Sequence, residues 1–532
     1  MTFAVEGEPG NLAIPSMGGV AVGTTGGGDL KLAVHQRLAT YDDHGELHPA
    51  LAAELPSQDR GTWLVRTDGT MQTTYKLRPG ITWHDGTPLS SKDFAFVWTV
   101  TSDPEVPMST RLSTQISRID TPDDLTLIYE WASTYPLANA LIDDELAPLP
   151  RHLLQSTYEA DKDRFQNLGY WTREFVGVGP YRVASWEAGS SLNLEAYDGF
   201  YAGRPHIDRL IVRFFADSNA VVSNLLAGAL DGTLARALDL EQTSYIEDQW
   251  RQAGKKFIFV AQTTHWRLLE VQLRPDLARP ADIIDPRIRQ GLLQAIDRQA
   301  LVDTVLRGQA PVSDTFIPPD DAKWAWVHSS VATYPFDPKR AQERLRDAGW
   351  QQTADGQWLD RLGNRISVPL HTRPDPQGER EISIIAGNWR SLGLGVEQVV
   401  WSVGEARDNK VIATYPGFAP TSNPLAFGNT LQVMYGRLCP SEQTRWSGRN
   451  HGCYQNPEMD RVIDGLNRAI DPADQQRLWS DMVRIQTQEL PVLPLYFNIQ
   501  AVLFREGVTG VKGDTKPRTS SMWDVADWDI TS

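Results

Sequence analysis

The stretch that most constrains this chain runs from Tyr75 to Trp98 and reads YKLRPGITWHDGTPLSSKDFAFVW. Within it, Pro79–Gly80 predicts the end of a strand, and Asp85–Gly86 predicts a second turn. Ser90 is a favourable helix cap, and Asp93 completes a capping-box pattern with it. The apolar residues that follow share one face of the predicted helix at i, i+3 and i+4: Phe94, Val97 and Trp98.

The same stretch contains His84 directly before Asp85, which suggests a reactive pair. The turn at Asp85–Gly86 and the helix cap behind it account for these residues without any chemistry. We therefore interpret the whole stretch as a local scaffold.

Length and composition indicate a folded protein with more than one lobe. At 532 residues the chain exceeds what one hydrophobic core ordinarily serves. The net charge of −16 argues against nucleic acid or an anionic membrane surface as a partner. No apolar run approaches the ~18 residues of a membrane span. The start of the chain lacks a basic segment followed by an apolar one, which indicates a cytoplasmic protein or a mature chain whose export signal has been removed.

The two cysteines help to choose between these compartments. Cys439 and Cys453 lie in a segment rich in glycine, proline and serine. A disulfide that closes such a loop stabilises a protein by roughly 3 kcal/mol when only chain entropy is considered. Two cysteines are too few for a structural zinc site. We therefore expect a disulfide rather than two free thiols, and hence an oxidising compartment outside the cytoplasm.

Three short motifs suggest ligand-binding loops, but the residues around each motif contradict that interpretation. Gly26–Gly28 suggests a phosphate cradle, yet no Gly-Lys-Ser/Thr follows. Gly177–Gly179 suggests a dinucleotide loop, but residues 181–196 alternate as a hairpin where a helix is required. His44 and His48 have the spacing of a metal pair on a helix, but the glycine and proline beside them indicate a loop. Strands and helices are mixed through the rest of the chain without repeats, which predicts a multi-lobe α/β or α+β architecture.

At Tyr75–Trp98 the sequence resembles bacterial extracellular solute-binding proteins of family 5, the oligopeptide-, dipeptide- and nickel-binding class of ABC-importer receptors. Further motifs of that family follow in the same order up to about residue 500. Gly291 stands where the family usually has alanine. The residues that carry the resemblance are Leu77–Leu89 with Asp93 and Phe94, Gly179–Tyr181 with Trp186, Asp285–Gln290 with Ala295–Arg298, Asp337–Pro338 with Ala348–Trp350, Leu392–Gly393 with Val396, and Pro491–Tyr496.

The resemblance implies an α/β, two-lobe clamp of the periplasmic-binding-protein type (type II, the large class with an extra subdomain in lobe I). Lobe I would comprise residues 1–260 and 490–532, with the extra subdomain at about 31–175. Lobe II would comprise residues 261–489. The two crossovers between the lobes would act as the hinge, and ligand binding would shift an open–closed equilibrium.

The resemblance also implies a role in transport and no catalysis. The protein would be an extracytoplasmic receptor, periplasmic or anchored at the cell surface, that delivers a solute to the permease subunits of an ABC importer. It would contact the membrane only through the permease or through a lipid anchor that has been removed. We expect a monomer with no cofactor, no metal and no nucleic-acid partner.

The family does not determine the ligand. Peptide-binding members tend to carry an aspartate for the ammonium group of the peptide after a strand that here includes Val411–Ala413. This chain has Tyr415–Phe418 at that place, and no acidic residue lies between Lys410 and Glu442. Aromatic and neutral polar side chains fit an oligosaccharide or another neutral polar compound. An oligopeptide or dipeptide is the alternative.

Candidate ligand contacts follow from position relative to the expected cleft. They come from the N-terminal loop, the first crossover, the loops of lobe II and the cysteine loop, and for each of them packing or ordinary surface is the competing interpretation. They are Thr24, Thr25, His265, Trp266, Trp401, Tyr415, Phe418, Arg445 and Trp446.

Three other functions remain open on sequence alone. Among 67 acidic residues, two carboxylates could be arranged for glycoside hydrolysis, although no GxSxG elbow, HExxH motif or metal-ligand cluster is present. The chain has ten scattered histidines, which do not exclude a metal- or haem-binding receptor. The same clamp could also sense a ligand without importing it.

Overall fold

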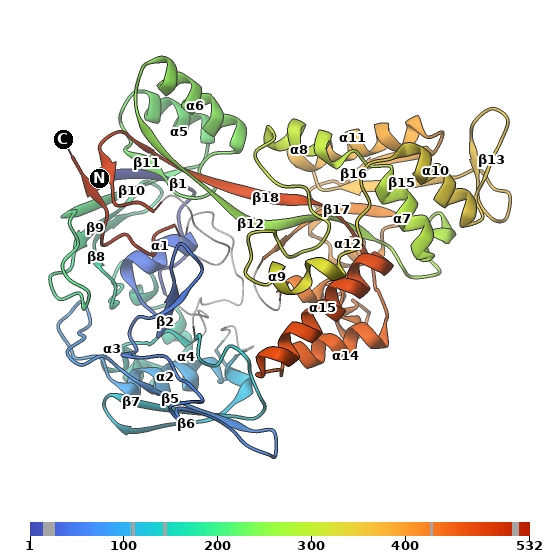
Figure 1. The fold of residues 1–532 in the computed structure, drawn as a ribbon. Coiled ribbons are helices and arrows are strands. Elements are labelled where there is room, and N and C mark those ends of the chain that lie inside the picture. The colour runs from blue at the N-terminus through green and yellow to red at the C-terminus, as the bar shows by residue number, and fades with distance from the viewer. Residues whose placement is uncertain are drawn as a thin grey trace. The chain divides into compact units, whose positions relative to one another are not determined.

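The computed structural model describes residues 1–13, 27–106, 108, 112–141, 146–425, 429–512 and 521–531. The chain forms two compact units, which we describe separately (Figure 1). Unit 1 is Met1–Gln262 with Gln500–Ser532, and unit 2 is Thr263–Ile499. The chain passes between them inside two long strands, β12 (Phe257–Val271) and β18 (Val492–Arg505). The second passage lies within β18, between Ile499 and Gln500.

Unit 1 contains part of a large sheet, a separate four-stranded sheet and two short two-stranded sheets, β2-β3 and β19-β20. In the large sheet, β1 pairs in parallel with β10 and β11, and β10, β9 and β8 follow as antiparallel neighbours. The four-stranded sheet has the antiparallel order β4-β5-β7-β6 and falls within the segment 31–175. The strands are β1 Thr2–Glu6, β2 Ala39–Tyr41, β3 Leu47–Pro49, β4 Trp63–Val65, β5 Met71–Lys76, β6 Ile116–Asp123, β7 Thr126–Trp131, β8 Tyr181–Glu187, β9 Ser191–Ala196, β10 Arg209–Phe215, β11 Gly232–Thr233, β19 Val508–Thr509 and β20 Asp529–Ile530. The helices are α1 Gly27–Val34, α2 Ser91–Thr101, α3 Arg151–Ala160, α4 Lys162–Gln166, α5 Ser218–Leu226 and α6 Leu240–Gln252.

The stretch Tyr75–Trp98 has the predicted structure. It runs from β5 through two turns into α2, and Ser90 precedes that helix. The Asp93 carboxylate accepts the backbone N–H of Ser90 at 2.8 Å and that of Arg151 at 3.0 Å. The hairpin predicted at 181–196 is also confirmed, as β8 and β9.

His84 connects this stretch to the glycine loop before the hairpin. Its Nδ1 accepts the N–H of Gly177 at 3.1 Å, and its Nε2 lies 3.1 Å from the carbonyl of Gly179. A Cβ on Gly177 would lie 2.0 Å from the carbonyl oxygen of Val34, so these glycines allow close packing against α1. Burial lowers the pKa of His84 to about 4, which keeps the ring neutral. The structure thus places both His84 and the loop Gly177–Gly179 in the scaffold of unit 1.

Unit 2 is built on a sheet with the order β16-β15-β17-β12 (Figure 1). β15 is parallel to both β16 and β17, whereas β12 is antiparallel to β17. The strands are β13 Gln351–Gln352, β14 Trp358–Leu359, β15 Ser367–Thr372, β16 Gly395–Val400 and β17 Phe418–Pro424. The helices are α7 Pro286–Gln294, α8 Arg298–Leu306, α9 Trp324–Val327, α10 Pro338–Asp347, α11 Pro376–Ser391, α12 Asn409–Thr414, α13 Asn429–Gln432, α14 Pro457–Leu466 and α15 Pro472–Glu489.

A buried ion pair joins α11 to this sheet. The Arg267 guanidinium on β12 donates to both carboxylate oxygens of Glu381, at 2.7 and 2.5 Å, and the Tyr496 hydroxyl bonds to the same carboxylate. Glu381 is completely buried. Such a pair fixes geometry, because removing either partner leaves an uncompensated buried charge. None of the helices that the structure describes is long and apolar enough to cross a membrane.

Candidate functional site

The polar and aromatic residues of interest in unit 2 gather where β15 and β16 end. The two strands are parallel, so their carboxyl ends meet at one edge of the sheet, which is where open α/β sheets commonly bind ligands. His371 is the second-last residue of β15, and Trp401 directly follows β16. The chain between them forms α11, whose first turn is capped by the Asp375 carboxylate at 2.7 Å from the Gly378 N–H.

Tyr415 reaches the same edge from the end of α12. Gly417 allows this approach, because a Cβ there would lie 2.2 Å from the carbonyl oxygen of Pro369 and its φ is +75°. The fully buried Gln272 side-chain amide donates to the carbonyl of Tyr415 at 2.9 Å. The close backbone packing at Gly417 and the Gln272 side chain thus hold Tyr415 in place.

His371, Trp401 and Tyr415 form what we call the aromatic cluster. The imidazole of His371 stacks on Trp401, with ring centres 5.7 Å apart and planes inclined by 28°. The Tyr415 ring lies 5.8 Å from each of the other two. Neither ring nitrogen of His371 has a well-formed hydrogen bond, and neither has the Tyr415 hydroxyl, although Pro416 and Glu270 are near them. Buried polar atoms are usually paired, so these atoms are exceptions, as are several others of the described chain, such as the Tyr129 hydroxyl and the Gln486 amide. The aromatic cluster differs in bringing three such atoms together at the carboxyl ends of two parallel strands.

Burial sets the protonation of the aromatic cluster. It lowers the pKa of His371, so the imidazole is neutral and offers one donor and one acceptor. Burial, together with the nearby Glu270 carboxylate, raises the pKa of Tyr415 well above its usual value, so the phenol keeps its proton. The cluster therefore presents neutral hydrogen-bonding groups beside flat aromatic faces.

A charged pair lies next to the aromatic cluster. Glu270 is buried on β12 opposite Ala419, and its carboxylate contacts Nδ1 of His451 at 3.0 Å. The Coulomb attraction of Glu270 outweighs burial and raises the pKa of His451. The His451 imidazole therefore holds its proton over a pH range in which the His371 imidazole is neutral.

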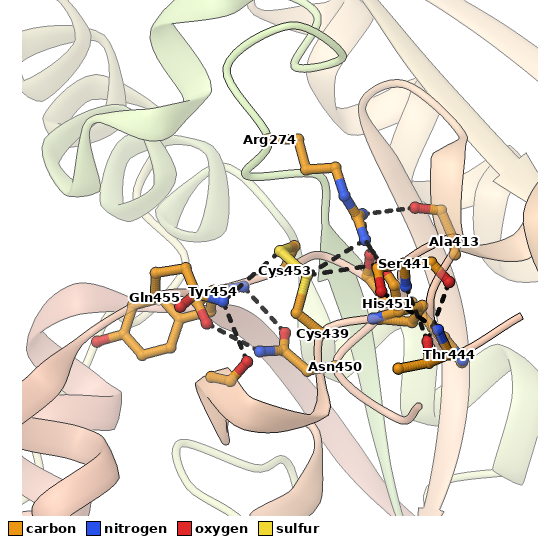
Figure 2. The surroundings of a disulfide bond; sticks show 12 residues. Arg274, Ala413, Cys439, Ser441, Thr444, Asn450, His451, Cys453, Tyr454 and Gln455 are labelled. Carbon is orange, nitrogen blue, oxygen red and sulfur yellow. Dashed lines mark hydrogen bonds between the residues drawn. A yellow bond between two sulfur atoms is a disulfide. The ribbon is translucent and has the colours of Figure 1, made fainter. Parts of the chain in front are cut away.

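His451 belongs to the loop that the cysteines close. Cys439 and Cys453 form a disulfide, as predicted. The Arg274 guanidinium clamps this loop by donating to the carbonyls of His451 and Pro440, each at 2.8 Å, and it lies 3.4 Å from Sγ of Cys439 (Figure 2). The disulfide and Arg274 thus hold the backbone that carries His451 toward Glu270.

The predicted ligand contacts are distributed unevenly. Trp401 and Tyr415 meet in the aromatic cluster, whereas Thr24 and Thr25 lie outside the described residues. His265 lies partly buried on β12.

Two further predicted contacts are completely buried in packing positions. The indole of Trp266 donates to the Ser313 hydroxyl at 2.8 Å, and the Phe418 ring packs edge-on against Trp389. Their surfaces are already covered by the core of unit 2. Trp266 lies in a strand that is buried there on both sides, which its sequence position did not indicate.

The last two predicted contacts lie in the disulfide loop away from this packing. Arg445 is exposed, and the ring of Trp446 has the ammonium of Lys410 5.5 Å from its centre. Both have positive φ, which marks a tight turn.

The segment Val411–Ala413, which we expect to be a strand, is part of α12. The Asp408 carboxylate caps this helix by accepting the N–H of Lys410 at 2.8 Å. The cap residue is visible in the sequence, but the resemblance to the family places a strand at this segment.

Sequence reasoning missed His371, Glu270 and His451. A charged residue inside the apolar strand LLEVQL and a histidine at the end of the buried strand VPLHT were the available signals. His451 had only its nearness to Cys453.

A separate group of side chains on unit 1 is close enough to share a cation: Asp42, Glu46 and His48. The Asp42 carboxylate already accepts the N–H groups of His44 and Glu46 and contacts the His48 ring at 2.8 Å. These bonds explain the group as a turn beside β3, and we assign no metal to it.

The comparisons place this chain among known proteins. The pattern described as "Bacterial extracellular solute-binding proteins, family 5 Middle" matches residues 46–428. Among curated relatives, the oligopeptide-binding protein AppA of Bacillus subtilis is 23% identical over 473 residues, which cover 87% of this chain and 81% of AppA.

Two solved structures share the fold over nearly the whole chain. NikZ of Campylobacter jejuni, in complex with Ni(L-His), has a TM-score of 0.75 at 19% identity and covers 99% of each chain. The oligopeptide-binding protein of Thermus thermophilus, in complex with a pentapeptide, has a TM-score of 0.73 at 20% identity and covers 100% of this chain and 96% of its own. The predicted α/β fold of the periplasmic-binding-protein type is therefore confirmed. With the family pattern spanning most of its length, the chain belongs to the bacterial extracellular solute-binding proteins of family 5.

Proposed function

We propose that this chain is the extracytoplasmic receptor of an ABC importer and that the aromatic cluster contacts the imported solute. The observation that carries the second part is the set of buried atoms without a well-formed bond, the two ring nitrogens of His371 and the hydroxyl of Tyr415. A solute that reaches them gains hydrogen bonds without displacing a well-formed one, and each such bond adds about 0.5–1.5 kcal/mol.

The chemistry of the aromatic cluster favours a ligand with neutral polar groups. A neutral imidazole donates one hydrogen bond and accepts one, and a phenol also does both. Peptide amides match this set, and the Trp401 face can cover the apolar part of a residue. We propose an oligopeptide as the ligand, supported by the names of the relatives AppA and the Thermus thermophilus protein.

A neutral oligosaccharide is the second candidate. It is favoured by the aromatic faces of Trp401 and Tyr415 and by the lack of an acidic residue between Lys410 and Glu442 that could meet an ammonium group. Sugar hydroxyls also donate and accept, and sugar C–H surfaces stack on aromatic rings. The aromatic cluster therefore serves either ligand, and charge at the ligand's terminus distinguishes them.

Several further properties belong to the same proposal. Members of family 5 are transport receptors rather than enzymes, and relatives are periplasmic or extracellular. We propose that this chain is likewise exported, monomeric and non-catalytic, that the two units act as the lobes of a clamp, and that it delivers its solute to permease subunits.

A thermal-shift screen tests the ligand class. The protein is unfolded and refolded to remove bound solute and is then mixed with peptides, the same peptides acetylated at the N-terminus, and neutral oligosaccharides. A ligand at ~100 times its Kd stabilises the fold by about 2.7 kcal/mol. Stabilisation by peptides whether acetylated or not supports the proposal. Stabilisation by oligosaccharides alone selects the second candidate, and a requirement for a free ammonium group contradicts neutral recognition.

Removal of a single hydroxyl tests whether the solute binds at the aromatic cluster. Tyr415→Phe removes the hydroxyl that lacks a well-formed bond, and we expect a loss of affinity of about tenfold with unchanged stability. Tyr435→Phe is the matched control, because the Tyr435 hydroxyl already donates to Asp464 at 2.5 Å in another part of unit 2. Equal affinity in the wild type and Tyr415→Phe would contradict the assignment of the aromatic cluster.

Two measurements address the competing functions. Recovery of the ligand intact after long incubation supports a receptor, whereas cleavage of it would show an enzyme. Stoichiometric metal in protein purified without chelator would show a metal-binding receptor.

A further inference from the structure

Unit 2 contains a cavity of about 390 Å³, and none of its lining residues belongs to the aromatic cluster. It lies where the segment after β12, the start of α7, the end of α15 and the residues after the disulfide meet. All of these segments belong to unit 2. The volume falls within the range of small-molecule sites.

The first charged residue that lines the cavity is Arg289 on α7. This residue is 2% exposed, and its guanidinium donates only to backbone carbonyls, those of Ile283 at 2.7 Å, Leu490 at 2.9 Å and Glu489 at 3.0 Å. Burial lowers the pKa of Arg289 to about 10, so it remains charged at neutral pH. The C-terminal carbonyls of α15 offset part of that charge. Among the described residues Arg289 forms no ion pair, although the carboxylates of Glu489 and Asp285 attract it.

The second positively charged residue that lines the cavity is Arg274. Its acceptors are also neutral: the carbonyls of the disulfide loop, the carbonyl of Ala413 and the side-chain oxygen of Gln272. Burial lowers its pKa, and among the described residues it forms no ion pair, although the Asp276 carboxylate attracts it. The cavity's carboxylate, Glu489, already accepts the Tyr454 hydroxyl at 2.5 Å and the Asn456 amide at 2.9 Å. The charged residues that line the cavity are therefore two arginines and one glutamate, whereas Asp276 and Asp285 are not part of the lining.

The rest of the lining is largely apolar. It includes Leu273, Pro275, Ile284 and Pro286, and the side chain of Ile284 is 47% exposed. A cation that is removed from water without a counter-charge is unfavourable, and an anion that enters from solvent provides that counter-charge. An apolar wall next to the cations selects an anion with an apolar body over a small inorganic ion.

We propose that this cavity is a second ligand site, distinct from the aromatic cluster, and that it binds a small organic acid. The carboxylate of the acid lies against Arg274 and Arg289, and its apolar body lies against Pro275 and Ile284. Because Cys453 lines the cavity and Arg274 clamps the disulfide loop, occupancy and loop order support each other. This proposal does not depend on the identity of the imported solute.

A matched pair of probes tests the need for a negative charge. The refolded full chain is titrated with 4-fluorobenzoate and with 4-fluorobenzamide, which has nearly the same shape but no charge, and the ¹⁹F signal is followed by NMR. Hydrogen bonds to a charged group contribute about 1.5–3 kcal/mol, so we expect the benzoate to bind at least about tenfold more tightly than the amide. Equal binding of the two probes, or binding of neither, would overturn the proposal.

A charge series at Ile284 tests the location without disturbing the fold, because this side chain is partly exposed and forms no polar bond. Ile284→Glu should weaken 4-fluorobenzoate binding about fourfold relative to Ile284→Gln, and Ile284→Lys should strengthen it, as expected for charges several ångströms apart near a surface. Added salt should shrink both differences.

His371→Phe is the control for binding at the aromatic cluster. It should leave 4-fluorobenzoate affinity unchanged. Loss of binding in His371→Phe, or the same affinity across the Ile284 series, would place the probe elsewhere and overturn the proposal. Failure of the solute screen leaves these outcomes unaffected, so the two proposals fail separately.

Discussion

His84 in unit 1 and His371 in unit 2 are equally buried, each 8% exposed, yet they are used in different ways. Both ring nitrogens of His84 meet backbone groups of Gly177 and Gly179, whereas those of His371 form no well-formed hydrogen bond. Both rings are neutral because burial lowers their pKa values. Burial therefore does not separate these two histidines, but the pairing of their ring nitrogens does.

A third histidine extends the comparison. His451 is also largely buried, but Glu270 raises its pKa, so it carries charge where the other two do not. Its position depends on the disulfide loop rather than on a strand or helix. The following predictions test whether unit 1 uses His84 for stability and unit 2 uses His371 and His451 for binding and loop order.

The largest expected effect is the loss of the scaffold histidine. His84→Ala removes a packed ring and its contacts with Gly177 and Gly179, and we expect the free energy of unfolding to fall by about 4 kcal/mol, as for other large-to-small core changes. Urea unfolding followed by circular dichroism measures it. His44→Ala, on the exposed loop of the same unit, should change stability by less than about 0.5 kcal/mol. A similarly small effect of His84→Ala would remove the scaffold role.

Removal of the disulfide comes next. The double variant Cys439→Ser/Cys453→Ser should lose about 3 kcal/mol, because the unfolded chain is no longer constrained. The same loss should appear in the wild type after reduction, and hydrogen exchange should increase around His451 first. Two free thiols counted in unreduced, unfolded wild-type protein would contradict the bond itself.

His84 and His451 should make the free energy of unfolding depend on pH in opposite directions. The pKa of His84 is lowered to about 4 in the folded state, so the unfolded chain binds more protons below 6.5, and stability should fall by about 2 to 3 kcal/mol as pH drops from 6.5 to about 4. The pKa of His451 is raised, so its contribution is complete below 6.5 and is lost as pH rises through the raised value.

Measuring the free energy of unfolding across this pH range in two variants separates the contributions of His84 and His451. His84→Gln should flatten the acid side, and His451→Gln should flatten the alkaline side. A variant that leaves its own side unchanged would contradict the role assigned to that histidine.

The smallest effect on stability is expected at the aromatic cluster. His371→Phe keeps a flat ring and removes two nitrogens that lack well-formed bonds, so the free energy of unfolding should change by less than about 1 kcal/mol or increase. Affinity for the solute found in the screen should fall at least about tenfold, measured by calorimetry. A loss of stability as large as that of His84→Ala would show that His371 is also part of a scaffold.

The parts of the fold that were predictable are those that local patterns specify. Turn residues and a cap predict the path from β5 to α2, and alternation predicts β8 and β9. At α12 the resemblance to the family led us to expect a strand, although Asp408 is present as a helix cap.

By itself, the sequence determined the family, the main secondary structure and the pairing of two cysteines, because caps, turns and periodicity act over a few residues. Only the tertiary structure decided which buried groups are satisfied. Glu270, His371 and His451 come from β12, β15 and the disulfide loop, and they are brought together by the pairing of β12 with β17 and by the bond between Cys439 and Cys453. Hydrogen-bond satisfaction depends on these long-range neighbours, so no local pattern could distinguish His84, which holds a scaffold together, from His371, whose nitrogens lack well-formed bonds.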